Sequence, residues 1–196
     1  MGEENKVQII DLVEAAPWPR LASSMEALGV DRMWLRGNAE LLNGPLTGFL
    51  CSIRCPGSVI LATHDYFKSP PADFGTVVSG FHSPLEKEVL RLLLRRKHPV
   101  VWCPARGLGS MRINPVMREA MDAGSVLIIS SFGPLVKRVD TNKAAARNRF
   151  VAGLSDRLII PHAAPGSVLA MAQSQNDWPP TPVIPIPSTI APHQAC

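Results

Sequence analysis

The segment Asp140–Pro161 reads DTNKAAARNRFVAGLSDRLIIP and carries the clearest structural signals of the chain. Its first part predicts a helix, which Thr141 or Asn142 can cap, three alanines favour and Gly153 can end. Residues 157–160 then form a short apolar run that is typical of a buried strand. A helix that leads directly into a buried strand indicates an α/β fold.

Arg147 is the unusual residue of this predicted helix. At about 100° per residue it falls within the same arc as Phe150, Val151 and Leu154, whereas Arg149 points away from that arc. A charged side chain on a packing face needs a partner. Two interpretations stay open: Arg147 pairs with a carboxylate of the fold or extends past the sheet edge, or it reaches an anionic ligand.

The whole chain has the composition of one globular domain. Its 196 residues are 46% hydrophobic, which is enough for one well-buried core. The net charge of +4 permits an acidic partner such as nucleic acid without requiring one. The N-terminus has no apolar signal core, and no apolar run approaches the ~18 residues of a membrane span. We therefore expect a cytoplasmic protein with no membrane partner.

The cysteines and glycines do not form the motifs of a metal or cofactor site. Cys51, Cys55, Cys103 and Cys196 lack the paired spacing of a zinc site or of a redox Cys-x-x-Cys. The fingerprints G-x-G-x-x-G and G-x-x-x-x-G-K-[ST] are also absent from the sequence. We expect no metal and no cofactor, and we interpret the cysteines as small core residues of a protein in a reducing compartment.

From residue 47 onwards apolar runs alternate with helical patterns. Runs rich in Val, Ile and Leu that alternate with helices of ten or more residues indicate a parallel sheet covered on both faces. The predicted fold class is α/β, with a doubly wound, Rossmann-like, mostly parallel sheet and helices on both faces. The predicted strands are residues 33–36, 47–53, 75–79, 98–103, 125–130, 157–160 and an edge strand at 183–186, and the predicted helices are 56–68, 83–97, 115–123 and 166–175.

The ends of the chain differ in pattern from its middle. Residues 1–30 contain two amphipathic segments, 7–16 and 21–28, which we expect to form short helices. The predicted parts are therefore an N-terminal helical extension of residues 1–30, a Rossmann-like domain of residues 31–187 and a flexible tail of residues 188–196.

Small and hydroxylic residues follow three of the predicted strands. Ligands bind an open parallel sheet at the carboxyl ends of its strands, where helix N-termini present free N–H groups. Ordinary turn chemistry explains any one of these turns, but three turns together with two arginines favour an anion site. The predicted ligand-binding residues are Ser52, Arg54, Gly57, Ser79, Gly80, Phe81, His82, Arg147, Asn148, Arg149, Gly166 and Ser167.

No residue is assigned a catalytic role. A lone histidine such as His82 at a helix start caps the helix or orients a ligand more often than it acts as an acid or base. Phe81 is a candidate for stacking on a base. Glu86 is explained by a capping box with Ser83, and Glu88 by a solvated helix turn.

The same turns resemble the DNA-processing protein A family (DprA, also called Smf) from about residue 34 to residue 187. Its relatives include the Rossmann-like phosphoribohydrolases that activate cytokinins. The matching segments are Leu35-Arg36-Gly37-Asn38, Cys51-Ser52-Ile53-Arg54 at the family's Gly-Ser-Arg-Lys position, Val77-Val78-Ser79-Gly80 and, as the most specific run, Arg147–Asp156.

The resemblance implies a function in DNA processing. Members of the family bind single-stranded DNA in a basic pocket and help to load the recombinase RecA during natural transformation. The implied partners are therefore single-stranded DNA or a nucleotide, a RecA-type recombinase and a second copy of the chain in a homodimer. Cys51 and Ile53 replace the family's glycine and first arginine, and residues 81–85 replace its Ala-Arg-Gly-Ile-Asp. The chain thus resembles a short, divergent member that lacks one phosphate-contacting arginine unless Arg54 replaces it.

Two alternatives follow from the same resemblance. The chain is either a nucleotide-binding sensor or a nucleoside-monophosphate phosphoribohydrolase-like protein, or it is a degenerate member that serves as an interaction scaffold. The phosphoribohydrolases carry Pro-Gly-Gly-x-Gly-Thr and a nearby glutamate, whereas residues 165–170 read PGSVLA. This difference disfavours hydrolysis and leaves nucleotide binding open.

Overall fold

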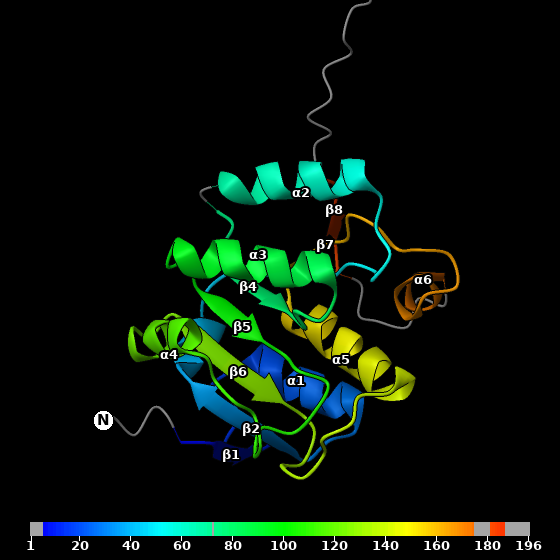
Figure 1. The fold of residues 1–196 in the computed structure, drawn as a ribbon. Coiled ribbons are helices and arrows are strands. Elements are labelled where there is room, and N and C mark those ends of the chain that lie inside the picture. The colour runs from blue at the N-terminus through cyan, green and yellow to red at the C-terminus, as the bar shows by residue number, and fades with distance from the viewer. Residues whose placement is uncertain (1–5, 72, 175–180, 187–196) are drawn as a thin grey trace, which may run out of the picture.

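The strands of this protein pair into an eight-stranded, mostly parallel sheet (Figure 1). The computed structural model describes residues 6–71, 73–174 and 181–186. The sheet order is β1-β2-β6-β5-β4-β3-β7-β8, in which β2 is antiparallel to both neighbours and the pairs from β6 to β8 are parallel. The strands are β1 Gln8–Asp11, β2 Arg32–Gly37, β3 Leu46–Phe49, β4 Thr76–Ser79, β5 Val100–Trp102, β6 Val126–Ser130, β7 Arg157–Ile159 and β8 Val183–Ile184.

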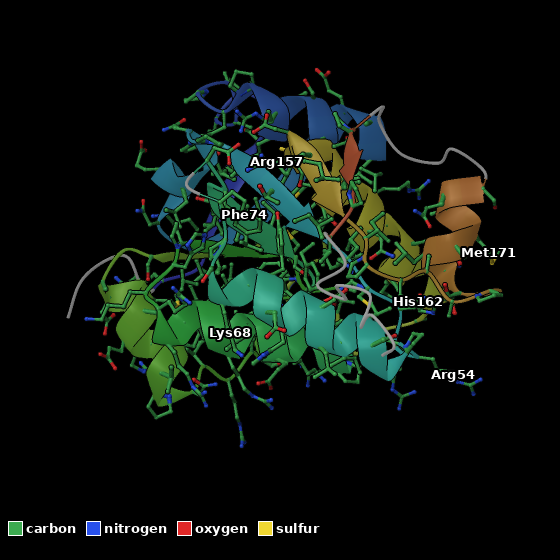
Figure 2. All side chains as sticks on the ribbon, turned by 90° about the horizontal axis from the view of Figure 1, so that it is seen from above. Arg54, Lys68, Phe74, Arg157, His162 and Met171 are labelled. Carbon is green, nitrogen blue, oxygen red and sulfur yellow. The ribbon has the colours of Figure 1, made fainter. Side chains whose placement is uncertain are left out.

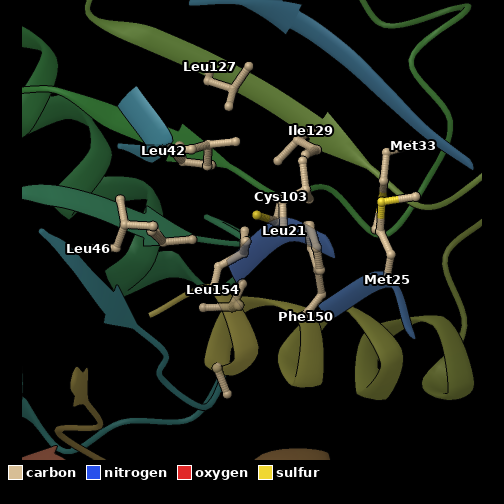
Figure 3. Packing of buried hydrophobic residues seen from close by; sticks show 14 of the residues in the cluster. Leu21, Met25, Met33, Leu42, Leu46, Cys103, Leu127, Ile129, Phe150 and Leu154 are labelled. Atoms are coloured by element: carbon tan, nitrogen blue, oxygen red, sulfur yellow. The ribbon is translucent and has the colours of Figure 1, made fainter. Parts of the chain in front are cut away.

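Helices cover both faces of the sheet, which confirms the predicted doubly wound, Rossmann-like α/β class (Figure 1). α1 and α5 pack together on one face, where Phe150 of α5 meets Leu21 and Met25 of α1 in a buried cluster (Figure 3). α2, α3 and α4 cover the other face over a second buried cluster. The helices are α1 Pro19–Leu28, α2 Gly57–Lys68, α3 Pro84–Arg95, α4 Pro115–Asp122, α5 Thr141–Leu154 and α6 Val168–Ser174, with a 3-10 turn, η2, at Ala39–Leu42.

The order of the strands reverses between β3 and β7. From β3 the chain steps outward through β4 and β5 to β6, and it then returns to place β7 on the other side of β3. The turns that leave β3 and β7 therefore diverge to opposite faces of the sheet. In a doubly wound sheet, the carboxyl ends of the strands at such a switch point form the natural ligand crevice.

The N-terminal segment differs from the sequence-based prediction. Residues 7–16 do not form a helix, because residues 8–11 pair with β2 as an antiparallel edge strand. The Asp11 carboxylate accepts the N–H groups of Val13 and Glu14, and this local turn ends the strand. The second predicted helix is confirmed as α1. The boundaries at residues 30 and 187 stay predictions, and residues 188–196 lie outside the described part of the chain.

Both ends of α5 also differ in detail from the prediction. Asp140, not Thr141 or Asn142, is the N-cap, since its carboxylate accepts the Lys143 N–H at 2.9 Å. Gly153 lies inside the helix, which ends at Leu154 because the next residue is already extended and leads into β7. A direct exit into a strand needs no left-handed glycine. The other predicted strands and helices are confirmed within the described residues, mostly with shorter bounds.

Candidate functional site

A pocket of about 700 Å³ opens at the switch point. Its walls come from the turn after β3, the turn before α3, the first half of α5 and the turn before α6. Figure 2 shows Arg54, His162 and Met171 at this end of the molecule, away from Arg157 and Phe74. The predicted ligand-binding residues that line the pocket are Ser52, Arg54, His82, Arg147, Asn148, Gly166 and Ser167.

Arg147 is the buried cation of the pocket. Only 7% of this residue is exposed, which confirms the predicted position on the packing face of α5. Its Nε donates to the side-chain oxygen of Asn148 at 2.8 Å, whereas neither terminal nitrogen donates a hydrogen bond to another described residue. Burial lowers the pKa of Arg147, and the negative charge of Glu86 opposes that shift. The guanidinium therefore has a carboxylate nearby but forms no ion pair within the described residues.

Glu86 connects two of the strand-end turns. Its carboxylate accepts the N–H groups of His82 at 2.6 Å and Ser83 at 3.1 Å, and the Ser83 hydroxyl accepts the Glu86 N–H at 3.2 Å. This confirms the predicted capping box. The same carboxylate also accepts the N–H of Cys51 at 2.9 Å, 35 residues away in the sequence. Local sequence cannot reveal that contact, because it depends on how β3 and β4 are placed.

Gly80 gives the guanidinium of Arg147 its space. A Cβ on Gly80 would lie 1.6 Å from Nη1 of Arg147 and 2.3 Å from Cζ. The Gly80 carbonyl accepts a hydrogen bond from Nε1 of Trp102 at 3.0 Å, which fixes the backbone there. Gly80 lies outside the pocket lining, so its role in this structure is to position Arg147 rather than to contact a ligand.

Four other predicted site residues lie outside the pocket lining. Phe81 is 2% exposed and packs in the core under α3, so the expected base stacking is wrong for this structure. Its positive φ of 44° belongs to a turn that the Ser79 hydroxyl closes by accepting the Phe81 N–H at 3.1 Å. Gly57 is exposed at the start of α2, and Arg149 is half-buried.

Ser52 and Ser167 join the two diverging turns. The Ser52 hydroxyl donates to the Ser167 hydroxyl at 2.9 Å and accepts the Ala164 N–H at 3.0 Å. The Ser167 hydroxyl accepts the N–H of Ala170 at 3.1 Å and so caps α6. Both hydroxyls therefore have structural partners already, and they close the floor of the crevice.

The sequence did not single out the apolar wall of the pocket. Val139, Ala144, Leu169 and Met171 line it, although each lies in a segment without a binding motif. Met171 is 51% exposed, so its side chain is accessible to a ligand. These residues come together because α6 packs against α5. Neither the hydrophobic periodicity of the sequence nor a sequence motif predicts that contact.

Burial shifts the pKa values of His82 and Cys51, two further titratable residues of the pocket, toward their uncharged forms. Burial lowers the pKa of His82, the charge of Arg147 lowers it further and that of Glu86 opposes the shift, and the net effect favours the neutral imidazole. Burial raises the pKa of the Cys51 thiol, which disfavours a reactive thiolate.

The described residues contain no group of three His, Cys, Asp or Glu side chains that could hold a metal ion. Among the described helices, none is long and apolar enough to cross a membrane.

Comparison with known proteins gives matches in structure but not in sequence. No family model matches the chain, and a search of curated proteins gives no match. The solved structure of DNA processing protein A from Streptococcus pneumoniae superposes with a TM-score of 0.75 and 19% identity, over 97% of this chain and 66% of that protein. The chain shares the fold of DNA processing protein A.

A second DprA structure supports the same conclusion. DprA from Helicobacter pylori, described for its single-stranded DNA binding mode, matches with a TM-score of 0.63 and 20% identity, over 83% of this chain and 75% of that protein. The chain spans just under two thirds of the length of the S. pneumoniae DprA. At these identities the likeness establishes the DprA fold and leaves the activity to be argued from the pocket.

Proposed function

We propose that this chain binds single-stranded DNA by holding a backbone phosphate in the pocket at the switch point. One observation carries the proposal: Arg147 is buried and lines a pocket of about 700 Å³, and both terminal nitrogens of its guanidinium are unused by other described residues. A guanidinium fork matches two phosphate oxygens, and it binds more strongly where water is displaced. The shared fold with DprA, whose H. pylori representative binds single-stranded DNA, supports this choice of ligand.

The rest of the pocket suits a nucleic-acid strand. The exposed Arg54 lines the pocket and can contact a second phosphate. This contact would replace the one made by the family's first arginine, whose position Ile53 occupies here. The apolar wall formed by Val139, Ala144, Leu169 and Met171 offers a surface for a sugar or base. In the cell we propose a cytoplasmic role in DNA uptake or recombination, with a RecA-type recombinase and a second copy of the chain as partners.

A second candidate is the binding of a small nucleotide. A pocket of about 700 Å³ lies within the range of small-molecule sites, which is ~300–1,000 Å³. Hydrolysis is less well supported, because both carboxylates of the lining already have partners. Glu86 accepts three backbone N–H groups, and Asp140 caps α5 and pairs with Lys143. Incubation with nucleoside monophosphates should therefore release no free base.

The direct test is the affinity for a fluorescently labelled oligo-dT, measured by anisotropy. Arg147→Ala is expected to weaken binding by about tenfold or more, as expected for a buried charge-assisted contact. Arg118→Ala removes the same charge from an exposed position on α4, away from the pocket, and should have a small effect. Equal affinities of Arg147→Ala and the wild-type protein would refute the proposed site.

A further inference from the structure

Glu86 places a negative charge at the floor of the pocket, near the guanidinium of Arg147. It is 2% exposed, lines the pocket and accepts three backbone N–H groups from two turns. These N–H groups donate to the carboxylate as they would to an external anion. The N–H groups of the turn before α3 thus already donate to a carboxylate of the chain itself, that of Glu86. A bound phosphate must instead rely on the α5 wall.

The buried charges of the pocket balance each other. Arg147 and Glu86 are the charged lining residues that are buried, whereas Arg54 and Asp140 are exposed at the rim. The Asp140 charge is also paired with Lys143. Charges in a buried site interact more strongly than charges at the surface, because water and salt screen them less. The floor of the pocket therefore has no net charge of its own, and a ligand charge beyond the one that pairs with Arg147 meets no second buried cation among the lining residues.

Phosphate groups differ in the charge that they bring to such a site. A phosphodiester, the linkage inside a DNA strand, carries a single negative charge. A phosphomonoester, as in a mononucleotide or at a 5′-phosphorylated end, carries about −1.5 to −2 at pH 7. The first charge of either ligand can pair with Arg147. The second charge of the monoester has no buried cation to meet and lies near Glu86.

We propose that Glu86 makes the pocket selective for phosphodiesters, and hence for the interior of a DNA strand, over phosphomonoesters. The inference rests on the proposed anion site at Arg147 and adds the class of phosphate that this site accepts. It also bears on the alternative function, since a pocket with this selectivity would disfavour nucleoside monophosphates.

Two small ligands that differ in a single charge test the inference. Thymidine 5′-phosphate and its methyl ester are compared as competitors of labelled oligo-dT, because the methyl group removes the second ionisation and leaves the base and sugar unchanged. On the wild-type protein, the methyl ester should displace half of the labelled oligo-dT at a concentration at least about fivefold lower than thymidine 5′-phosphate needs. Glu86→Gln should reduce or reverse this preference. Glu88→Gln should keep it, since Glu88 pairs with Arg91 and lies outside the pocket lining.

The outcomes separate this inference from the proposed function. Equal competition by the two ligands in the wild-type protein overturns it, whether or not Glu86→Gln folds. An unchanged preference in a Glu86→Gln protein with a native circular-dichroism spectrum overturns it too. If neither ligand competes while Arg147→Ala still weakens oligo-dT binding, the DNA site stands and the selectivity does not. If Arg147→Ala binds oligo-dT like the wild-type protein, both proposals are wrong.

Discussion

Arg147 shows how much a single residue can be predicted from a helical period. Its burial was expected from the arc that it shares with Phe150, Val151 and Leu154, and all four are buried. The space that it occupies was not predictable, because that space depends on Gly80 at the end of a distant strand. The predicted stacking of Phe81 on a base does not fit the structure, because the ring lies in the core. Its backbone is left-handed, and no sequence pattern predicts that conformation at this position.

Gly80 gives the sharpest test at the scale of one residue. Gly80→Ala would place a methyl group 1.6 Å from Nη1 of Arg147, so the guanidinium must move. We expect a loss of about 1–3 kcal/mol in the free energy of unfolding, which is typical of overpacking, and a loss of oligo-dT affinity close to that of Arg147→Ala. Urea denaturation and anisotropy measure the two effects.

Gly57→Ala is the matched control for this substitution. A Cβ on Gly57 meets nothing within 4 Å, and the residue lies outside the pocket lining. Its stability and affinity should therefore stay near the wild-type values. A Gly80→Ala protein that binds oligo-dT normally would show that the position of the guanidinium does not matter for DNA.

At the scale of an element, the start of α3 combines a predictable part with an unpredictable one. Ser83, Pro84 and Glu86 signal the capping box in the sequence, and the structure contains it. The bond from Cys51 to Glu86 is invisible at this level, although it turns a local cap into a link between two strands. A helix start that also builds the pocket should respond differently to mutation than one that is only a cap.

Two N-cap substitutions test that difference. Ser83→Ala removes the side-chain oxygen that accepts the Glu86 N–H at the start of α3. Asn114→Ala likewise removes the oxygen that accepts the Met117 N–H at the start of α4. Each should cost about 1 kcal/mol in the free energy of unfolding. Only Ser83→Ala should also weaken oligo-dT binding, by a fewfold, because it loosens the carboxylate at the pocket floor. Equal binding by the two variants would mean that the cap and the pocket are independent.

For the whole molecule, the sequence predicted the layers better than the connections. Alternating apolar runs were enough for a parallel sheet with helices on both faces. The edge strand at residues 8–11 was missed, because its pairing with β2 comes from tertiary contacts that outweigh a weak helical pattern. The pocket likewise follows from topology, since β3 and β7 are neighbours although residues 47 and 157 are far apart in the chain.

The pairing of β3 with β7 is held from both ends. Ser52 and Ser167 join the two sides at the carboxyl end. At the other end Arg157 of β7 donates to the Thr47 hydroxyl of β3 at 2.9 Å and to the Asp73 carboxylate at 2.8 Å. Figure 2 shows Arg157 well away from Arg54 at the pocket end. The contacts of Arg157 should therefore affect stability without affecting DNA binding.

The pH dependence of stability tests this separation. The hydrogen bond and the charge of Arg157 hold the pKa of Asp73 below its usual value. A carboxyl whose pKa is depressed on folding stabilises the native state above its unfolded pKa of about 3.9, and the effect is lost as the pH falls through the folded value. Asp73→Asn should therefore lower Tm at pH 7, and the gap to the wild-type protein should narrow progressively as the pH falls below about 4. Asp31→Asn, an exposed aspartate without an ion pair to a described residue, should leave Tm unchanged at pH 7. A gap for Asp73→Asn that does not narrow as the pH falls below about 4, or a change in its oligo-dT affinity, would contradict this division between a stabilising end and a binding end of the sheet.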